Sequence, residues 1–122
     1  MAERIAPMIH VPDVKATAEW YASIGFEIRD VGRECDDGDV IWALLRLGES
    51  TVMLSAGGKA SDAHRREFDL YIYAEEIDRR YEELKSRVDI IEEPHDTFYG
   101  MREFLLRDCN RFWITFAEPM VR

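Results

Sequence analysis

The first half of the chain opens with an extended apolar stretch at 4–11 and continues with apolar residues at helical spacing over 14–24. Asp13 precedes the helical pattern, and its carboxylate can accept an amide hydrogen of the first turn, so it is the expected N-cap. Gly25 can take the left-handed conformation that commonly ends a helix. The pattern therefore predicts a strand followed by a helix.

Three further strands complete the pattern of the first half. They are expected at 26–31, 40–47 and 50–55, and the last two are joined by the turn residues Gly48 and Glu49. The segment 32–38 between the first two is polar and typical of a loop. Small and charged residues fill 56–65, including two adjacent glycines, so this stretch is the predicted linker.

The second half repeats this order of elements. A strand is predicted at 68–73, and a helix follows in which Ile77, Tyr81, Leu84 and Val88 form one apolar stripe. A short strand at 89–92 is expected to stop before Glu93 and Pro94, and 95–99 is expected to be an exposed loop. A final hairpin is predicted from strands at 102–107 and 112–117.

Both halves thus read β-α-β-β-β, and the similar fragments 44–46 and 105–107 occupy equivalent places in them. An internal duplication is the simplest explanation. The predicted fold class is α+β, with one domain over 1–122 built from modules at about 1–60 and 61–122. Two curved mixed sheets are expected to face a cleft, where small-molecule sites are commonly found.

Composition narrows the possible partners. Sixteen basic against twenty-five acidic side chains give a net charge of −9, which argues against nucleic acid as a partner. The same charge favours a cationic small molecule if it gathers around a cleft, although it also serves solubility alone. No apolar run approaches the roughly 20 residues that cross a bilayer, so no membrane partner is expected.

Cys35 and Cys109 are the only cysteines, and in a chain long enough to bury a core they are expected to be reduced thiols. The N-terminal residues lack the apolar core of a secretory signal. The chain is therefore expected to be cytoplasmic.

Two stretches carry a resemblance to a known family. Residues 7–26 resemble the opening of glyoxalase and bleomycin resistance modules, in which an aspartate opens the helix, an aromatic pair lies near its middle, and Gly-Phe follows. Residues 99–108, Tyr-Gly-Met-Arg-Glu-Phe-Leu-Leu-Arg-Asp, resemble bleomycin resistance proteins more closely still. Nearly the whole chain is similar to the vicinal oxygen chelate superfamily, which comprises glyoxalases, bleomycin resistance proteins and extradiol dioxygenases.

Metal-dependent members of that superfamily hold a divalent ion with His, Gln or Glu from four strands. By position the four places fall on Ala6, Met53, Phe68 and Thr115, none of which is a usual ligand. A register shift of one residue would bring Glu67 to a place, but one carboxylate does not hold a metal. We therefore expect no metal and no other cofactor.

Catalytic groups are equally hard to find in the sequence. Cys35 lies among acidic residues that oppose thiolate formation, and Cys109 follows Asp108 in the last turn, so both read as incidental thiols. His64 and His95 fall in predicted loops without ligand spacing and read as solvated histidines. No catalytic residue is assigned.

Aromatic residues are the remaining candidates for a binding site. By resemblance, Trp42 and Tyr99 match aromatics that line the drug cleft of bleomycin resistance proteins, where flat rings stack on a planar group. Tyr71 and Tyr73 share one face of their strand, whose relation to the cavity the sequence leaves open. His10 is a candidate at the cavity mouth. Core packing remains the alternative for the aromatic residues, and a structural or surface role for His10.

Other parts of the resembling segments are expected to be structural. Trp20, Tyr21 and Trp113 are predicted to pack in the core. Arg102 and Glu103 match the family's Arg-Glu and are expected to form an ion pair or to fix a turn. Arg111 stands where the family's last turn usually has glycine, so that turn is expected to adopt another shape.

The favoured hypothesis is a metal-free, non-catalytic protein that sequesters a partly aromatic, cationic small molecule such as a bleomycin-class antibiotic. By resemblance it is expected to be a homodimer. The alternative is a superfamily enzyme, a glyoxalase-like lyase, an isomerase or a thiol transferase, with a divergent site. Such a site would use His10 with a nearby carboxylate or an unidentified metal site. A third possibility is a domain whose partner is another protein.

Overall fold

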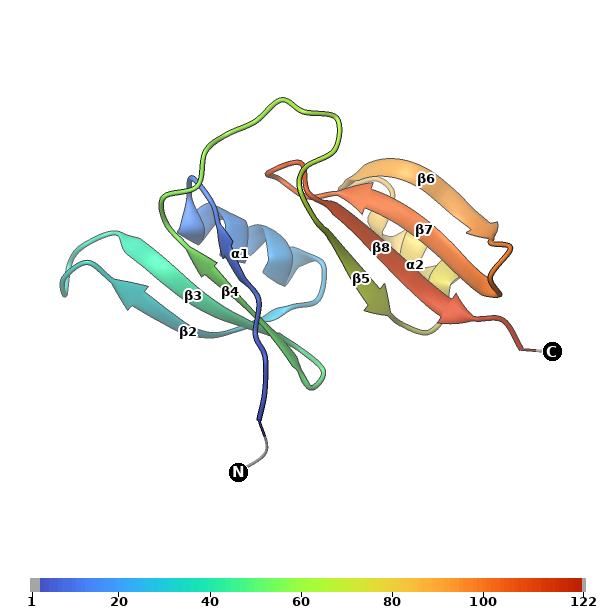
Figure 1. Ribbon diagram of the computed structural model, residues 1–122, viewed down its shortest axis with the longest axis horizontal. Coiled ribbons are helices and arrows are strands. Elements are labelled where there is room, and N and C mark those ends of the chain that lie inside the picture. Colours follow the sequence, from blue (N-terminus) through green and yellow to red (C-terminus); the bar gives the residue numbers. More distant parts are fainter. Residues whose placement is uncertain (1–2, 122) are drawn as a thin grey trace. The chain divides into compact units, whose positions relative to one another are not determined.

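Short extended segments and one helix assemble into the same arrangement twice in the computed structural model, which describes residues 3–121. In the unit Met1–Ala60 the elements are β1 (Met8–His10), α1 (Val14–Ser23), β2 (Glu27–Arg33), β3 (Val40–Leu47) and β4 (Ser50–Ser55) (Figure 1). They form one four-stranded sheet in the order β1-β4-β3-β2. β1 runs parallel to β4, and the other neighbouring strands are antiparallel.

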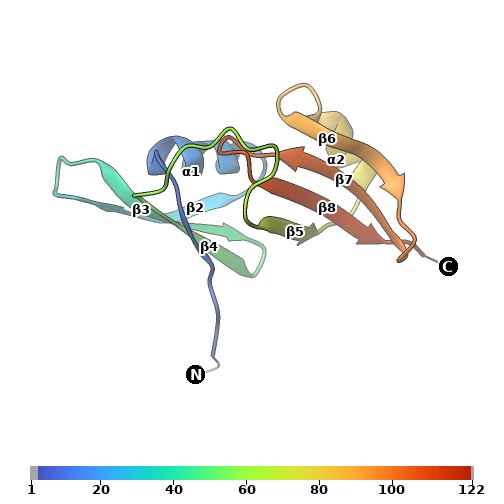
Figure 2. The same cartoon turned by 45° about the horizontal axis from the view of Figure 1, so that its top comes forward.

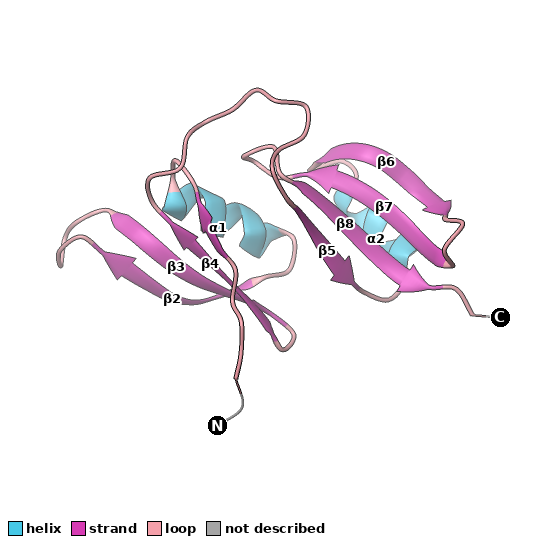
Figure 3. Ribbon diagram, viewed as in Figure 1, coloured by secondary structure: helices cyan, strands magenta, loops and turns pink. Residues whose placement is uncertain are grey.

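The unit Ser61–Arg122 repeats this plan with β5 (Asp69–Tyr73), α2 (Ile77–Leu84), β6 (Asp89–Asp96), β7 (Met101–Arg107) and β8 (Trp113–Pro119) (Figure 3). Its sheet has the order β5-β8-β7-β6, with β5 parallel to β8. The predicted α+β class with two βαβββ modules is confirmed. No helix in the part of the chain that the structure describes is long and apolar enough to cross a membrane.

The first helix forms as its sequence predicts. The Asp13 carboxylate accepts a hydrogen bond from the backbone N–H of Ala16 at 2.9 Å, which satisfies one of the unpaired amides of the first turn. Gly25 follows the helix with a φ of 116°. Val14, Ala18 and Tyr21 are buried on the side of α1 that faces the sheet, so the helix is held by an apolar stripe.

The second helix is shorter than predicted and begins without a capping side chain of its own. Its N-cap residue, Glu76, has a φ of 54°. The Glu118 carboxylate from the end of β8 accepts hydrogen bonds from the backbone N–H groups of Glu76 and Ile77 at 3.2 and 3.1 Å. The helix ends at Leu84, so Val88 lies outside it, in the turn that leads to β6. A distant part of the sequence therefore supplies the cap.

Strand β6 corrects two expectations, because it runs through Pro94 and includes His95, where the sequence predicted the end of a strand and a loop. Proline cannot donate to a strand ladder, so it is tolerated on edge strands and at irregularities. β6 is the edge strand of its sheet, and its pairing with β7 shifts register between Ile90 and Glu92 and again between Glu92 and His95. These two features let the strand continue past the proline.

Strand boundaries differ from the prediction elsewhere as well. β1 covers only Met8–His10 of the predicted 4–11, and Ile5 before it is exposed. β2 extends to Arg33, into the predicted loop. β3 and β4 match their predicted ranges.

Each sheet has one face packed against its helix and one open face (Figure 2). In the second unit the side chains of Phe104, Leu106, Ile114 and Phe116 are buried on the helix side. Because side chains alternate along a strand, Glu103, Leu105 and Thr115 lie on the open face. The open face of this sheet therefore carries the buried polar side chains of Glu103 and Thr115.

The strand pairings also relate the two units residue by residue. Met8 pairs with Met53 in the first unit, as Tyr71 pairs with Thr115 in the second. Leu44 pairs with Met53, as Leu105 pairs with Thr115, so the similar fragments 44–46 and 105–107 are structurally equivalent. By the same register Trp42 is equivalent to Glu103.

The segment between the units contains a glycine that cannot be replaced without a shift in the backbone. A Cβ added at Gly58 would lie 2.2 Å from the carbonyl oxygen of His10. The Gly58 N–H donates to the carbonyl oxygen of Val11 at 3.2 Å. Gly58 thus allows the segment to lie directly against the end of β1.

Candidate functional site

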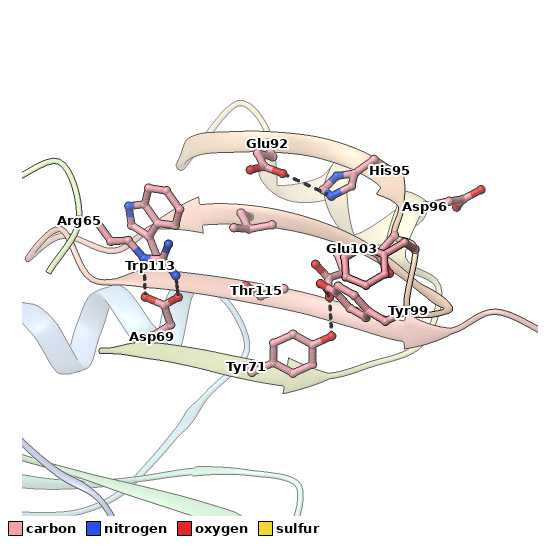
Figure 4. Close-up of a pocket in the computed structure, with 13 residues that line it drawn as sticks. Arg65, Asp69, Tyr71, Glu92, His95, Asp96, Tyr99, Glu103, Trp113 and Thr115 are labelled. Carbon is pink, nitrogen blue, oxygen red and sulfur yellow. Dashed lines mark hydrogen bonds and ion pairs between the residues drawn. The ribbon is translucent and has the colours of Figure 1, made fainter. Parts of the chain in front are cut away.

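A cavity of about 540 Å³ lies on the open face of the second sheet (Figure 4). All four strands of this sheet contribute to it, together with the segment before β5 and the β6–β7 turn. Among the described residues that line it are four acidic side chains and one arginine: Asp69, Glu92, Asp96, Glu103 and Arg65. The cavity is therefore acidic, in keeping with the charge of the chain.

Glu103 lies at the centre of the hydrogen-bonding groups of this cavity. Its side chain is buried, with 4% of the residue exposed. The hydroxyl groups of Tyr71 and Tyr99 both donate to Oε2 of Glu103, the second at 2.7 Å. No group among residues 3–121 donates to the other oxygen, Oε1. One oxygen of a buried carboxylate is thus available to a ligand that carries an N–H donor.

The two tyrosines are held in their protonated, donating form. Burial of its phenol and the hydrogen bond to the Glu103 carboxylate raise the pKa of Tyr71 well above its ordinary value, although part of the ring is exposed. The hydrogen bond to Glu103 is the main cause that raises the pKa of Tyr99. A carboxylate that accepts a hydrogen bond from a phenol O–H favours the neutral phenol, so both residues stay hydrogen-bond donors at neutral pH.

A second polar group occupies the other end of the cavity. Arg65 forms a double ion pair with Asp69, with Nε to Oδ1 at 3.3 Å and a shorter contact from the terminal guanidinium nitrogen. The guanidinium carbon also lies 4.3 Å from the centre of the Trp113 ring. Nε1–H of Trp113 donates to the carbonyl oxygen of His64 at 3.0 Å, which fixes the indole.

The edge strand β6 contributes a histidine that the sequence placed in a solvated loop. His95 faces the cavity, and its Nε2 lies 3.3 Å from a carboxylate oxygen of Glu92. Asp96 points away from this cluster and pairs with Arg102 at 2.8 Å. The predicted loop is therefore wrong for His95, because β6 continues beyond Pro94, whereas its side chain is 40% exposed and so is solvated as expected.

The structure separates the three candidate tyrosines by position. Tyr71 and Tyr99 line the cavity. The sequence left open which face of β5 meets the cavity, and the structure shows that it is the face that carries Tyr71. Tyr73 is 74% exposed and does not line the cavity, but its ring packs edge-on against Tyr71 at 5.2 Å. Phe98 packs against Tyr99 in the same way at 5.1 Å. Their roles in ligand binding stay predictions.

The other two candidates lie on the open face of the first sheet. Both His10 and Trp42 pair with Ser55, from the two neighbouring strands, so the three residues form one row across the sheet. Trp42 is partly buried, and its ring lies beside Gly32. Nδ1 of His10 lies 3.1 Å from the carbonyl oxygen of Ala56. The structure thus places these two residues in one row with Ser55 between them, and a ligand role for them also stays a prediction.

One of the four positions matched to the superfamily's metal ligands needs correction. Because Met8 and Tyr71 are equivalent, the counterpart of Ala6 in the second unit is Asp69, and not Phe68. Phe68 instead stacks on Phe112, with ring centres 4.3 Å apart. The four places then hold one carboxylate, whose partner is Arg65. No group of three His, Cys, Asp or Glu side chains suited to a metal ion occurs within residues 3–121, so this donor set does not fit a superfamily metal.

The Arg102–Glu103 pair of the family motif does not form an ion pair. The two side chains lie on opposite faces of β7, since neighbours alternate along a strand. Arg102 is structural and joins Asp78 of α2 and Asp96 of β6, at 2.8 Å each. Glu103 belongs to the cavity instead. Its place in the motif was visible in the sequence, but its partners come from β5 and from the β6–β7 turn.

The last turn also differs from expectation. Arg111 has a φ of 72°, so it adopts the left-handed conformation that favours glycine, and the change from glycine does not remove that conformation. Its Nε donates to the carbonyl oxygen of Ala63 at 2.7 Å, which ties the turn to the segment before β5. Both cysteines are exposed.

Comparison with known proteins places this geometry in a family. The model of the Glyoxalase/Bleomycin resistance protein/Dioxygenase superfamily matches residues 4–116, nearly the whole chain. The chain belongs to this superfamily. No protein with a curated description matches its sequence.

Several solved structures share the fold at low identity. TioX from Micromonospora sp. ML1 is 18% identical with a TM-score of 0.75, and the match covers 98% of this chain and 100% of that one. A glyoxalase-related enzyme from Clostridium phytofermentans is also 18% identical with a TM-score of 0.73, over 98% and 97% of the two chains. A bleomycin-binding protein complexed with bleomycin is 17% identical with a TM-score of 0.70, over 96% and 98%. These likenesses establish the fold alone.

Proposed function

We propose that this superfamily member binds a small, partly aromatic, cationic molecule in the cavity of its second unit and sequesters it without chemical change. The observation that carries this proposal is Glu103, a buried carboxylate with one oxygen unpartnered by the described residues and directed into an acidic cavity. Within residues 3–121 the only buried side-chain nitrogen or oxygen without a partner is Nε of Arg80, so this oxygen is accessible from the cavity, where a cationic N–H donor can form a charge-assisted hydrogen bond with it. Sequestration needs a preformed, complementary cavity and no reacting group.

Aromatic rings around Glu103 support the same ligand class. Tyr71 and Tyr99 present ring edges and faces beside the carboxylate, and Trp113 lies further along the cavity. A ring stacked on a ligand contributes about 0.5–1.5 kcal/mol beyond burial. A ligand cation over such a ring adds about 0.5–2 kcal/mol. Tyr73 would extend the aromatic surface at the rim through its contact with Tyr71.

We include Trp42 and His10 as a second ligand-contacting surface on the open face of the first sheet. Trp42 takes there the position that Glu103 takes in the second unit. An aromatic ring at this position would suit a flat apolar group of a ligand bound on the first sheet.

A bleomycin-class antibiotic is the first ligand to test, because one protein of the same fold is a bleomycin-binding protein. Antibiotic resistance is the biological role that would follow from sequestration. We further propose that the chain works as a homodimer in the cytoplasm. A symmetric dimer would present each candidate surface twice.

A superfamily enzyme is the second candidate. The observation that favours it is the hydrogen-bonded set of Glu103 with two tyrosines, since a carboxylate and a phenol can exchange protons with a substrate. His10 is less suited to this role because one ring nitrogen already contacts the carbonyl oxygen of Ala56. Conversion of a bound compound, detected by mass spectrometry, would favour the enzyme.

The decisive experiment is a fluorescence titration of the full chain with metal-free bleomycin. The three tryptophans lie in different places, so single variants Trp113→Phe and Trp42→Phe report which surface the drug approaches. We expect saturable quenching at one drug per protomer. The Trp113 component of that quenching should disappear in the Trp113→Phe variant, and binding should weaken in Tyr99→Ala.

Absence of binding by calorimetry at high drug concentration would remove bleomycin as ligand. A panel of other aromatic cations would then test the wider proposal. If none of these cations binds and neutral aromatics do, the role assigned to Glu103 is wrong.

A further inference from the structure

The guanidinium group of Arg65 lies in the cavity at a position where the planar cationic group of a ligand could bind. Its guanidinium lies over the Trp113 ring at 4.3 Å and is paired on its edge with the Asp69 carboxylate. Figure 4 shows this pairing next to the indole. An aromatic face combined with a carboxylate in the ring's neighbourhood is a complete recognition set for a planar cation.

The receptor part of this arrangement is rigid, and the occupant is not part of the sheet. Trp113 belongs to β8, is only 9% exposed, and is fixed by its hydrogen bond to the His64 carbonyl oxygen. Asp69 pairs with Trp113 across the parallel strands β5 and β8. Arg65 precedes β5, and its side chain is 54% exposed. The guanidinium can therefore leave without disturbing a strand.

A neighbouring arginine shows what a purely structural stack looks like in this chain. Arg66 lies over the ring of Phe112 at 4.4 Å, but its side chain is only 10% exposed. It donates to the carbonyl oxygen of Asn110 at 3.0 Å and does not line the cavity. Arg65 lacks this burial and lies inside the cavity.

We infer that Trp113 and Asp69 form a subsite for a planar amidinium or guanidinium group, and that Arg65 is its internal occupant, which an incoming ligand displaces. The inference deepens the proposed function and rests on the cavity being a ligand site. It assigns the subsite to a class of ligand group, aryl amidines and alkyl guanidines. It also explains how the Asp69 carboxylate is kept neutralised when no ligand is bound.

An internal occupant lowers the apparent affinity for an external one by the fraction of molecules in which the subsite is vacant. Removing Arg65 should therefore strengthen binding of a planar cation, roughly fivefold for an occupant held by one cation–π contact and one exposed ion pair. A merely structural Arg65 would give the opposite sign, since its loss would loosen the cavity wall.

The test uses benzamidine as the probe and the indole N–H signals of the three tryptophans in a ¹H–¹⁵N spectrum, with Trp113→Phe to assign the Trp113 signal. In the wild-type chain we expect benzamidine to shift the Trp113 signal with weak affinity. Arg65→Gln should bind roughly fivefold more tightly. Asp69→Asn should lose the Trp113 shift.

Two matched variants separate displacement from a change in net charge. Arg66→Gln removes the same charge one residue away and should leave the affinity for benzamidine unchanged. Arg65→Lys keeps the charge but loses the planar fork, so it should retain part of the gain. It also supplies a second variant if Arg65→Gln does not fold. Equal or weaker binding by the Arg65 variants would overturn the inference.

Failure of the inference can be told from failure of the proposed function. Bleomycin binding at the cavity without any benzamidine response would leave the proposed function intact and remove the subsite. Failure of both ligands to bind would remove both.

Discussion

The isosteric change Glu103→Gln tests the proposed function at its central residue. The amide oxygen of glutamine can still accept the hydrogen bonds from Tyr71 and Tyr99, so the shape of the site is kept. The amide NH₂ then points where Oε1 meets the ligand, and a cationic donor finds another donor instead of an acceptor. Hydrogen bonds to a charged group contribute about 1.5–3 kcal/mol, so the affinity for a cationic ligand should fall about 10- to 150-fold.

The stability of the fold should change much less than the affinity. Glu103 is 4% exposed, and removing a buried charge recovers part of its desolvation cost while weakening two hydrogen bonds. The two effects oppose each other, so the free energy of unfolding should stay within about 1 kcal/mol of wild type. For a chain of this length that corresponds to a change of about 4 °C or less in Tm.

Calorimetric titration with metal-free bleomycin measures the affinity, and thermal denaturation followed by circular dichroism measures the stability. Glu49→Gln, in the β3–β4 turn, makes the same charge change outside the cavity and should alter neither. Unchanged affinity in Glu103→Gln would refute the reasoning. So would a loss of more than about 3 kcal/mol of stability, because Glu103 would then be a structural residue.

Three further predictions concern stability. Gly58→Ala should lower the free energy of unfolding by about 1–3 kcal/mol, because the new Cβ meets the His10 carbonyl. Urea unfolding should show a smaller loss for Gly32→Ala, where the Cβ would lie at an ordinary contact distance of 3.5 Å from the Trp42 side chain. The raised pKa of Tyr71 means that its contribution is complete below about pH 10 and is lost as pH rises through the folded-state pKa. The wild type should thus lose more stability than Tyr71→Phe between about pH 9 and 11. An equal change in the urea midpoint of the two proteins over this pH range would contradict the prediction. Glu118→Ala should cost about 1 kcal/mol by uncapping α2, whereas the matched Glu75→Ala should not, as thermal melts would show.

Much of the fold could be read from local patterns in the sequence. Strands β3 and β4 and the Asp13 cap depend on neighbouring residues only, and these features were predicted correctly. The course of β6 through Pro94 was not predictable in this way. It depends on the strand being at the edge of its sheet, which is a property of the whole sheet.

The candidate site shows the same limit more strongly. Tyr71 and Tyr99 were found from their aromatic character and from family resemblance. Glu103 and Arg65 were missed as cavity residues, because their importance lies in partners that are distant along the chain or on another strand. An acidic residue among many gives no signal until its burial is known.

The residue-by-residue equivalence of the two units has a consequence for how such a protein changes over evolution. Positions that face the helices, such as Leu45 and Leu106, keep the same apolar character in both copies, since each must fill a core. Positions on the open faces have diverged, with Trp42 in one copy where Glu103 stands in the other. In a duplicated sheet, the side chains on the face without a helix can change in one copy, while the other copy and both cores stay the same. New ligand preferences can then arise by single substitutions on the open face while the residues that pack against the helices are kept.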